Sequence, residues 1–535
     1  MTGGITRRIG IDVGGTNTDA VLIEDERVVY SVKRPTTEDV TGGVVAALAA
    51  VRAHPGGAGA VDAVVIGTTH FINAVVQRRA LTKVAAIRIG LPASASLPPF
   101  CDWPADLAAL VEDGVHGIEG GHEFDGRPFM PLDTAGLRAA ARAIRDSGVT
   151  SVAVASVFSP LDPSCEQAAR EILAEICPDV SVTLSYDLGR IGLLERENAA
   201  LLNAALRDLA RTTVAGFRAA MARSGIAAPL YLTQNDGTVM DADVAIRFPV
   251  MSFASGATNS MRGAAHLSGL SDAMVVDVGG TTSDFGQFRN GFPREANAVV
   301  EVGGVRTLFR MPDLLSIGVG GGSRIGADGA VGPLSVGYAL PREARIFGGP
   351  TLTASDVAVA AGLADFGARD RLADLDPALV AAALATIRTR IEDGVDRMKM
   401  EAGDVPLIAV GGGAFLVPDG LAGVSEVIRV PHGDCANAVG AAIAQVSGEV
   451  DQVFSGVGRA EALAEAERIA RSRAIAAGAE AASVATVEIE DVPLAYLPGG
   501  ALRVRARAAG RIAPSAGPRP DGGPAAQPAV ATRAD

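Results

Sequence analysis

Two short segments of nearly the same sequence lie half a chain apart, and this repeat constrains the fold more than any other feature. Residues 11–19 read Ile-Asp-Val-Gly-Gly-Thr-Asn-Thr-Asp, and residues 276–284 read Val-Asp-Val-Gly-Gly-Thr-Thr-Ser-Asp. Each copy follows an apolar run, which is typical of a buried strand. The offset is 265 residues in a chain of 535. The repeat therefore predicts two homologous lobes, each with a strand that ends in a tight hairpin.

Each copy contains the residues that a phosphate-binding turn requires. The Gly-Gly pairs let the backbone turn tightly and approach a ligand, so that its N–H groups can bind phosphate oxygens. Asp12 and Asp277 would hold Mg²⁺, which keeps several waters and few carboxylates as ligands. One copy alone would fit an ordinary β-hairpin turn equally well, but two copies favour a clamp for the phosphates of ATP. The expected nucleotide-binding residues in the two copies are Gly14, Gly15, Thr16, Asn17, Thr18, Asp19, Gly279, Gly280, Thr281, Thr282 and Asp284.

A third glycine-rich segment supports the same interpretation. Residues 405–410 read as a buried strand that runs into Gly411, Gly412 and Gly413. We expect this turn to pack against the adenosine part of the nucleotide. The alternative is a simple turn between a strand and a helix.

Composition and charge exclude several classes of protein. The net charge is −14 and the pI about 5.0, whereas a nucleic-acid binder usually carries a basic patch. None of the three lysines (Lys33, Lys83 and Lys399) lies in a P-loop motif. No apolar run approaches the roughly 20 residues of a membrane span, and no signal peptide is evident at the N-terminus. The four cysteines are widely spaced, so we expect reduced thiols and a cytoplasmic location.

Strands alternate with amphipathic helices along most of the chain, which indicates an α/β protein. At 535 residues two or three domains are the default expectation. We expect a long helix near residues 455–478, then a hairpin over residues 484–508. The Pro-, Gly- and Ala-rich end is expected to be disordered. The predicted divisions are a first lobe at 1–188, a second lobe at 189–450, a C-terminal helix and hairpin at 451–512 and a tail at 513–535.

The chain resembles the hydantoinase/oxoprolinase family, in particular the A subunit of N-methylhydantoinase. That family belongs to the sugar kinase, heat-shock-70 and actin superfamily. The likeness covers about residues 5–450 and rests on several segments besides the two hairpins. These are Gly67-Thr68-Thr69 with Asn73-Ala74 and Arg78, residues 123–127, residues 156–160, Glu195-Arg196 with Asn203-Ala204, and residues 317–323 with Gly320 and Gly321.

The resemblance implies a two-lobed, actin-like ATPase fold with duplicated ribonuclease-H-like lobes and a nucleotide cleft between them. It also implies a subunit that uses ATP and Mg²⁺ to open a cyclic amide such as a hydantoin, 5-oxoproline or a lactam. In this family the A-type subunit is thought to phosphorylate the amide oxygen. We therefore expect a small cyclic-amide substrate, an oligomer and a B-type partner subunit. Long family members continue well past the end of this sequence, and residues 255–260 depart from the family's usual Ser-Gly-Pro-Ala-Gly-Gly.

Glu195 and Arg196 are the remaining catalytic candidates, beside Asp12 and Asp277. They precede an apolar helix, and charge at a helix start has an ordinary structural explanation. We predict instead that they order substrate or nucleotide. Two other functions fit the same superfamily. One is a small-molecule kinase, although the usual Asp is missing near residues 197–200. The other is a nucleotide-driven reactivating or assembly factor.

Overall fold

The computed structural model describes residues 6–14, 17–36, 40–189, 191–296, 300–454, 456–494 and 500–513. The predicted phosphate ligands Gly15 and Thr16, and the predicted tail from residue 514 onward, lie outside these residues. Within the described ranges, no helix has the length and apolar character needed to cross a membrane.

The first repeat lies in a nine-stranded sheet with the order β22-β23-β21-β10-β9-β4-β1-β2-β3. The sheet begins as an antiparallel meander of β3, β2 and β1, and β4 and β9 continue it parallel to β1. These strands are β1 (Arg7–Val13), β2 (Asn17–Glu24), β3 (Arg27–Pro35), β4 (Ala63–Thr68) and β9 (Leu230–Thr233). Helix α1 (Val40–Ala53) packs with Ala20 and Leu22 of β2, and helix α12 (Ala436–Ile443) packs with Val21 and Ile23 on the opposite face.

The second repeat lies in a separate sheet that starts with the same arrangement. Its order is β13-β12-β11-β19-β20, and β16 also pairs with β12. Strands β11 and β12 form the antiparallel hairpin, while β19 and β20 run parallel to β11. The strands are β11 (Ala273–Val278), β12 (Ser283–Arg289), β13 (Phe292–Pro293), β16 (Leu314–Ile317), β19 (Val405–Val410) and β20 (Val424–Arg429). The predicted duplication is therefore present in strand order as well as in sequence.

Two helices pack closely together between these sheets. Helix α8 (Ser255–Ser268) crosses α12, and small residues permit the close approach. A Cβ on Gly263 would lie 2.0 Å from the carbonyl oxygen of Ala436, and one on Gly440 would lie 1.9 Å from that of Asn259. On the far side, helix α11 (Pro377–Met398) covers the second sheet, and the side chain of Asp376 caps its first turn.

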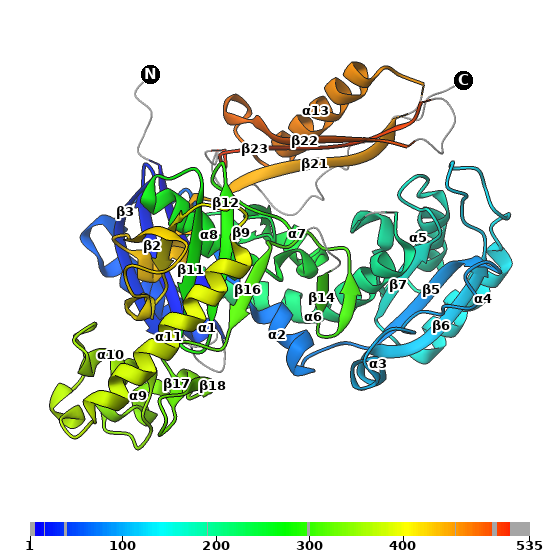
Figure 1. Ribbon diagram of the computed structural model, residues 1–535. Helices are drawn as coiled ribbons and strands as arrows, with labels where there is room; N and C mark the ends of the chain where they lie inside the picture. The colour runs from blue at the N-terminus through cyan, green and yellow to red at the C-terminus, as the bar shows by residue number, and fades with distance from the viewer. Residues whose placement is uncertain are drawn as a thin grey trace.

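A third sheet lies apart from the first two, on the opposite side of the molecule from β2 and β3, where Figure 1 labels β5, β6 and β7. Its four strands are all parallel in the order β6-β5-β7-β8. They are β5 (Val84–Leu91), β6 (Glu112–Glu119), β7 (Ser151–Ser156) and β8 (Ser181–Leu184), and they pack with α4 (Thr134–Ser147) and α5 (Ser164–Ile176). Since β9 follows this sheet in the chain and returns to the first sheet, residues 84–184 are inserted between β4 and β9. The domain boundaries given above stay predictions.

The long helix α6 (Leu193–Arg223) joins the inserted sheet to the first one. It packs against β7 and α1, and its buried side chains belong to the core of the first sheet.

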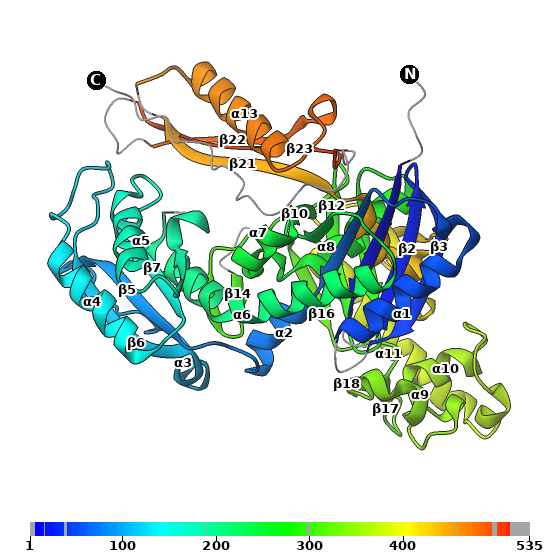
Figure 2. The ribbon, with the colours of Figure 1, turned by 180° about the vertical axis from the view of Figure 1, so that it is seen from behind.

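The C-terminal strands lie across the top of the molecule, covered by one helix (Figures 1 and 2). They are β21 (Gln445–Phe454), β22 (Ala485–Pro493) and β23 (Leu502–Gly510), and the helix is α13 (Arg459–Ala476). The expected helix and hairpin are thus present. The strands extend the first sheet, because β21 pairs with β10 (Thr238–Asp241).

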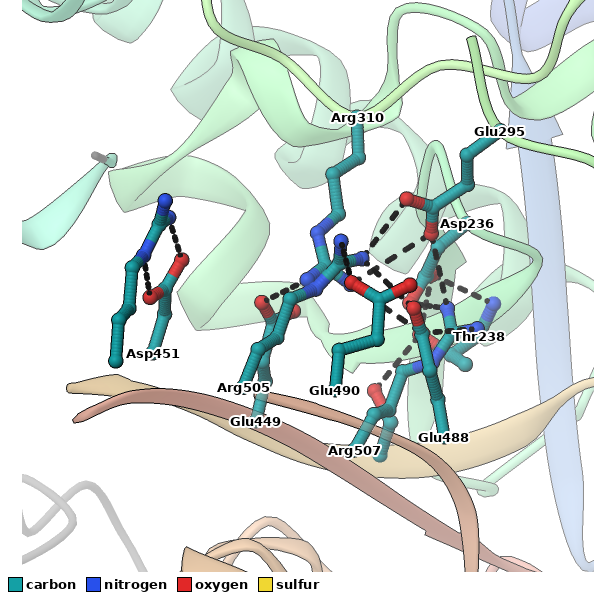
Figure 3. Close-up of polar contacts among 12 residues, drawn as sticks. Asp236, Thr238, Glu295, Arg310, Glu449, Asp451, Glu488, Glu490, Arg505 and Arg507 are labelled. Carbon is teal, nitrogen blue, oxygen red and sulfur yellow. Dashed lines mark hydrogen bonds and ion pairs between the residues drawn. The ribbon is translucent and has the colours of Figure 1, made fainter. Parts of the chain in front are cut away.

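Ion pairs fasten these strands to the loop that leaves the second hairpin. Figure 3 shows Arg505 and Arg507 of β23 directed toward Glu295 and Arg310 of that loop. Arg505 lies 2.8 Å from Glu295, and Arg310 lies 2.8 Å from Glu449 of β21. Arg507 is buried and pairs with Asp236 at 3.0 Å. Charge pairs therefore hold the C-terminal strands in place beside the ATPase-like sheets.

Candidate nucleotide site

The two hairpins have the same turn geometry. The N–H of Gly14 donates to the carbonyl of Asn17 at 3.0 Å, and the N–H of Gly279 donates to that of Thr282 at 2.9 Å. In the first hairpin Asp12 pairs in register with Asp19, and in the second Asp277 pairs with Asp284. Directly opposed residues of an antiparallel pair share one face of the sheet. Each hairpin therefore presents two carboxylates side by side.

Asp12 and Asp277 are held near each other at the ends of β1 and β11. The carboxylate of Asp12 accepts a hydrogen bond from the Asn437 amide of α12 at 3.3 Å, and its other oxygen is buried without a hydrogen-bond partner among the described residues. Burial raises the pKa of Asp12 to about 7, helped by the charges of Asp19 and Asp277. Burial also raises the pKa of Asp277, and Asn437 and Lys33 oppose the rise. Since Asn437 acts on both carboxylates, it lies between the hairpins.

Lys33 and Asn437 contact the carboxylates of the first hairpin, and sequence reasoning missed both. The ammonium of Lys33 lies 2.5 Å from Asp19 and donates to the backbone carbonyl of Asp434 at 3.0 Å. The register of β2 with β3 sets Lys33 opposite Asp19. A search for lysines that follow each candidate carboxylate by one strand and one turn would have found Lys33. No sequence signal marks Asn437.

The other predicted residues of the hairpins take different positions. Asn17 is half-buried and Thr281 is exposed at the second turn. Thr18 is fully buried, and its hydroxyl lies 3.2 Å from that of Thr36, on the face of β2 opposite to Asp19. Asp284 is half-buried, and burial raises its pKa to about 6. Of these residues, Asp284 lies on the same face as Asp277.

Gly320 and Gly321 support the second hairpin from behind. The N–H of Gly321 donates to the carbonyl of Gly279 at 3.0 Å. A Cβ on Gly320 would lie 2.6 Å from the amide nitrogen of Thr281. Because they have no side chain, these two glycines can lie directly against the backbone of the turn at residues 279–281.

The glycine triplet after β19 lies against the end of β11. Gly411 has a left-handed backbone (φ +86°), and a Cβ there would lie 2.2 Å from the carboxylate of Asp277. The N–H of Gly413 donates to the carbonyl of Val278 at 2.8 Å. By contrast, a Cβ on Gly412 would have no protein atom within 4 Å. Gly412 therefore faces open space while its two neighbours pack on the second hairpin.

That open space is a cavity of about 670 Å³ beside the triplet. Its wall combines glycine backbone, apolar side chains and polar groups, among them Gly411, Gly412, Leu363, Phe415, Pro418 and Arg429. His432, Gly433 and Asp434 also line it, so the cavity reaches the residue whose carbonyl binds Lys33. Its volume is within the range of sites that bind cofactors and small molecules.

Glu195 and Arg196 lie in another part of the molecule, at the start of α6. Arg196 is fully buried and donates to the hydroxyl of Ser185 at 2.9 Å and to the carbonyl of Ile191 at 2.8 Å. Glu195 accepts from Arg306 at 3.1 Å. These contacts are with residues that follow β8 and with strand β15 (Val305–Thr307), whereas the hairpins lie at the ends of β1 and β11. A catalytic role for the two residues stays a prediction.

Two family models match the chain. The model for the hydantoinase/oxoprolinase N-terminal region matches residues 8–177, and the hydantoinase/oxoprolinase model matches residues 196–400. Together they span most of the chain.

Curated relatives match over about two thirds of the chain. The caprolactamase subunit alpha of Pseudomonas jessenii is 28% identical over 64% of this chain and 51% of its own length. The acetophenone carboxylase gamma subunit of Aromatoleum aromaticum is 27% identical over 65% of this chain and 52% of its own length. The chain thus spans about half the length of these relatives.

Solved structures match over almost the whole chain. The ATP-dependent caprolactamase from Pseudomonas jessenii superposes with a TM-score of 0.70 at 20% identity, covering 98% of this chain and 90% of that one. Nucleotide-free acetone carboxylase gives 0.66 at 18% identity, covering 96% and 89%. These matches confirm the two-lobed, actin-like α/β fold that the repeat and the resemblance predicted.

Proposed function

The chain belongs to the hydantoinase/oxoprolinase family, and from this premise we propose that it is an ATP-dependent hydrolase, or a subunit of one, that opens a cyclic amide. One observation carries the proposal. Two equivalent hairpins bring paired carboxylates together beside a cavity of about 670 Å³ that is lined by glycine backbone, apolar side chains and polar groups. The caprolactamase relative, whose name gives a lactam as its substrate, supports a cyclic amide here.

The residues present fit a Mg²⁺–ATP complex. The glycine-rich turns of the two hairpins suit phosphate oxygens, and the unpartnered oxygen of Asp12 is a suitable Mg²⁺ ligand. The described residues contain no cluster of three or more His, Cys, Asp or Glu side chains that would cage a metal on its own. Mg²⁺ bound by one or two carboxylates together with phosphates and waters requires no such cluster. Gly412 leaves room for the nucleoside in the cavity.

The chemistry that ATP supplies is activation of the amide. Transfer of its terminal phosphoryl group to the amide oxygen leaves ADP and makes the amide carbon of the ring susceptible to attack by water. The ring C–N bond then breaks, and phosphate leaves as the acid forms, with two waters consumed overall. The protein's own residues position the phosphates and neutralise charge, which is most of what phosphoryl transfer requires. Asp12 and Asp277 are the metal ligands in this proposal, and closure of the lobes would exclude water.

A partner subunit is part of the proposal. The two relatives are named as subunits of their enzymes. We therefore assign the complete reaction to an oligomer of this chain with a B-type partner. The chain by itself would bind and turn over ATP.

The test is Mg²⁺-dependent ATP hydrolysis by the full chain, with and without hydantoin, 5-oxoproline or a simple lactam. Turnover that rises with one ring compound and falls at least about 100-fold in Asp12→Asn and Asp277→Asn would support the proposal. Asp187→Asn is the matched control, because Asp187 is a partly buried carboxylate of the inserted region. A stable phosphorylated product without ring opening would identify a kinase instead. Slow turnover that responds only to a client protein would identify a reactivating factor.

A further inference from the structure

We propose that Lys33 binds the phosphate chain of the nucleotide and supplies the positive charge that the two hairpins lack. The inference rests on the nucleotide site proposed above. It concerns a residue outside both repeats and outside the glycine triplet.

The cleft has an excess of negative charge before any nucleotide enters. The two hairpins contribute Asp12, Asp19, Asp277 and Asp284, and the loop after β20 contributes Asp434. A polyphosphate adds several more negative charges, while one Mg²⁺ offsets only two. Carboxylates close to phosphate oxygens repel them strongly where water is excluded. A protein cation is therefore required beside the phosphates.

Lys33 is the cation that the fold places there. Burial raises the pKa of Asp12, Asp19 and Asp277, and the charge of Lys33 opposes that rise at each of them. Burial is also the largest influence on Lys33 and lowers its pKa, but the neighbouring groups, Asp19 foremost, together raise it more, so the net pKa lies above its usual value and the side chain stays charged. An ammonium is a compact point charge and a common phosphate ligand.

The side chain is placed to reach both parts of the cleft. Its ammonium lies 2.5 Å from Asp19 on the first hairpin and 3.0 Å from the carbonyl of Asp434, a residue of the cavity wall. The side chain keeps 32% of its surface exposed, so a ligand can touch it. An ammonium has three N–H donors, and two suffice for these partners. Lys33 thus lies where the cavity meets the hairpins.

A second contact strengthens this placement. Ser31, two residues earlier on β3, lies 3.1 Å from the ring of His432, which also lines the cavity. Strand β3 of the first sheet therefore touches the loop of residues 432–434 at two points. These two contacts fix the position of the Lys33 side chain relative to the loop of residues 432–434.

A purely structural role makes a different prediction. If Lys33 served only to hold Asp19, removing either partner of the pair would have the same effect. If Lys33 binds phosphate, removing Asp19 leaves the ammonium in place and lowers the repulsion, so the affinity falls less than it does when Lys33 is removed. The two substitutions therefore separate the roles.

The experiment measures binding by isothermal titration calorimetry, with Mg²⁺, on the full chain. The probes are a non-hydrolysable ATP analogue and adenosine, which has no phosphates. The variants are Lys33→Met, Lys33→Arg and Asp19→Asn. Lys83→Met is the matched control, since Lys83 binds the backbone carbonyls of Ala109 and Glu112 away from the cleft. Melting temperatures of all variants show whether each is folded.

For Lys33→Met we expect the Kd of the analogue to rise at least about tenfold, and that of adenosine to stay within about twofold. Lys33→Arg should retain most of the analogue affinity, Lys83→Met should retain all of it, and Asp19→Asn should lose less than Lys33→Met. An unchanged Kd in Lys33→Met, or equal losses in Lys33→Met and Asp19→Asn, would overturn the inference. If the wild-type chain binds neither probe, the nucleotide site proposed above is wrong and the inference falls with it.

Discussion

Three adjacent glycines after β19 should respond to alanine substitution in three different ways. The structure places Gly411 and Gly413 against the second hairpin and Gly412 against the cavity. Because the substitution is the same at each position, each of the three variants serves as a control for the other two. The comparison separates residues that support the hairpin from the residue that faces the nucleotide.

The expected magnitudes follow from the backbone and from the space at each position. Gly411→Ala combines a left-handed backbone, which costs about 1–2 kcal/mol, with a Cβ 2.2 Å from the carboxylate of Asp277. Overpacking of this kind adds about 1–3 kcal/mol, so we expect a loss of about 2–5 kcal/mol. Gly413→Ala places its Cβ 2.7 Å from a methyl of Val278 without the backbone strain, and should lose about 1–3 kcal/mol. Gly412→Ala should change stability by less than about 1 kcal/mol.

Urea denaturation and binding of an ATP analogue test these expectations together. Gly412→Ala should unfold at the wild-type midpoint but raise the Kd of the analogue about tenfold, because its methyl enters the cavity. Gly411→Ala should lower the midpoint and also weaken binding, since it displaces Asp277. Equal destabilisation by all three substitutions, or unaltered binding by Gly412→Ala, would refute the reasoning.

Three further experiments test other parts of the account. Arg88→Met should lower the free energy of unfolding by about 3–5 kcal/mol, because it leaves the buried carboxylate of Glu197 unpaired. Adding Glu197→Gln should recover part of that loss in a denaturation series, and strictly additive losses would contradict the pairing. Burial raises the pKa of Asp187 to about 6, so its contribution to stability is full below pH 4 and is lost as the pH rises through 6. Asp187→Asn should therefore be more stable than wild type by about 1–3 kcal/mol at pH 7 and should lose this advantage at pH 4. A constant difference in stability between pH 4 and pH 7 would argue against this explanation. Arg507→Met should loosen the C-terminal strands, seen as faster hydrogen exchange in β23 with unchanged exchange in β11. The same exchange rate in β23 of the variant and of wild type would mean that the ion pairs of Arg507 do not hold the C-terminal strands.

The duplicated hairpin could be predicted from the sequence because its information is local. Asp12 and Asp277 each follow an apolar strand and precede Gly-Gly, so their positions at the ends of β1 and β11 follow from the chain itself. The same repeat predicted two homologous lobes, and the structure has two sheets that begin with the same strand arrangement.

Features that depend on long-range pairing could not be predicted. Lys33 and Asn437 reach the carboxylates through strand register and through a helix more than 400 residues away in sequence from Asp12. The inserted sheet carries strands like those of any α/β domain, so nothing local shows that β9 returns to the first sheet. Glu195 and Arg196 belong to a segment that carries the family resemblance, and only the fold shows that Arg196 donates to Ser185 and Ile191.

The most direct test of the central claim is a crystal structure of the full chain with Mg²⁺ and a non-hydrolysable ATP analogue. The account predicts phosphates between the turns at Gly14 and Gly279, the metal on Asp12 or Asp277, and the adenosine in the cavity beside Gly412. A nucleotide bound elsewhere, or one in contact with a single hairpin, would contradict it.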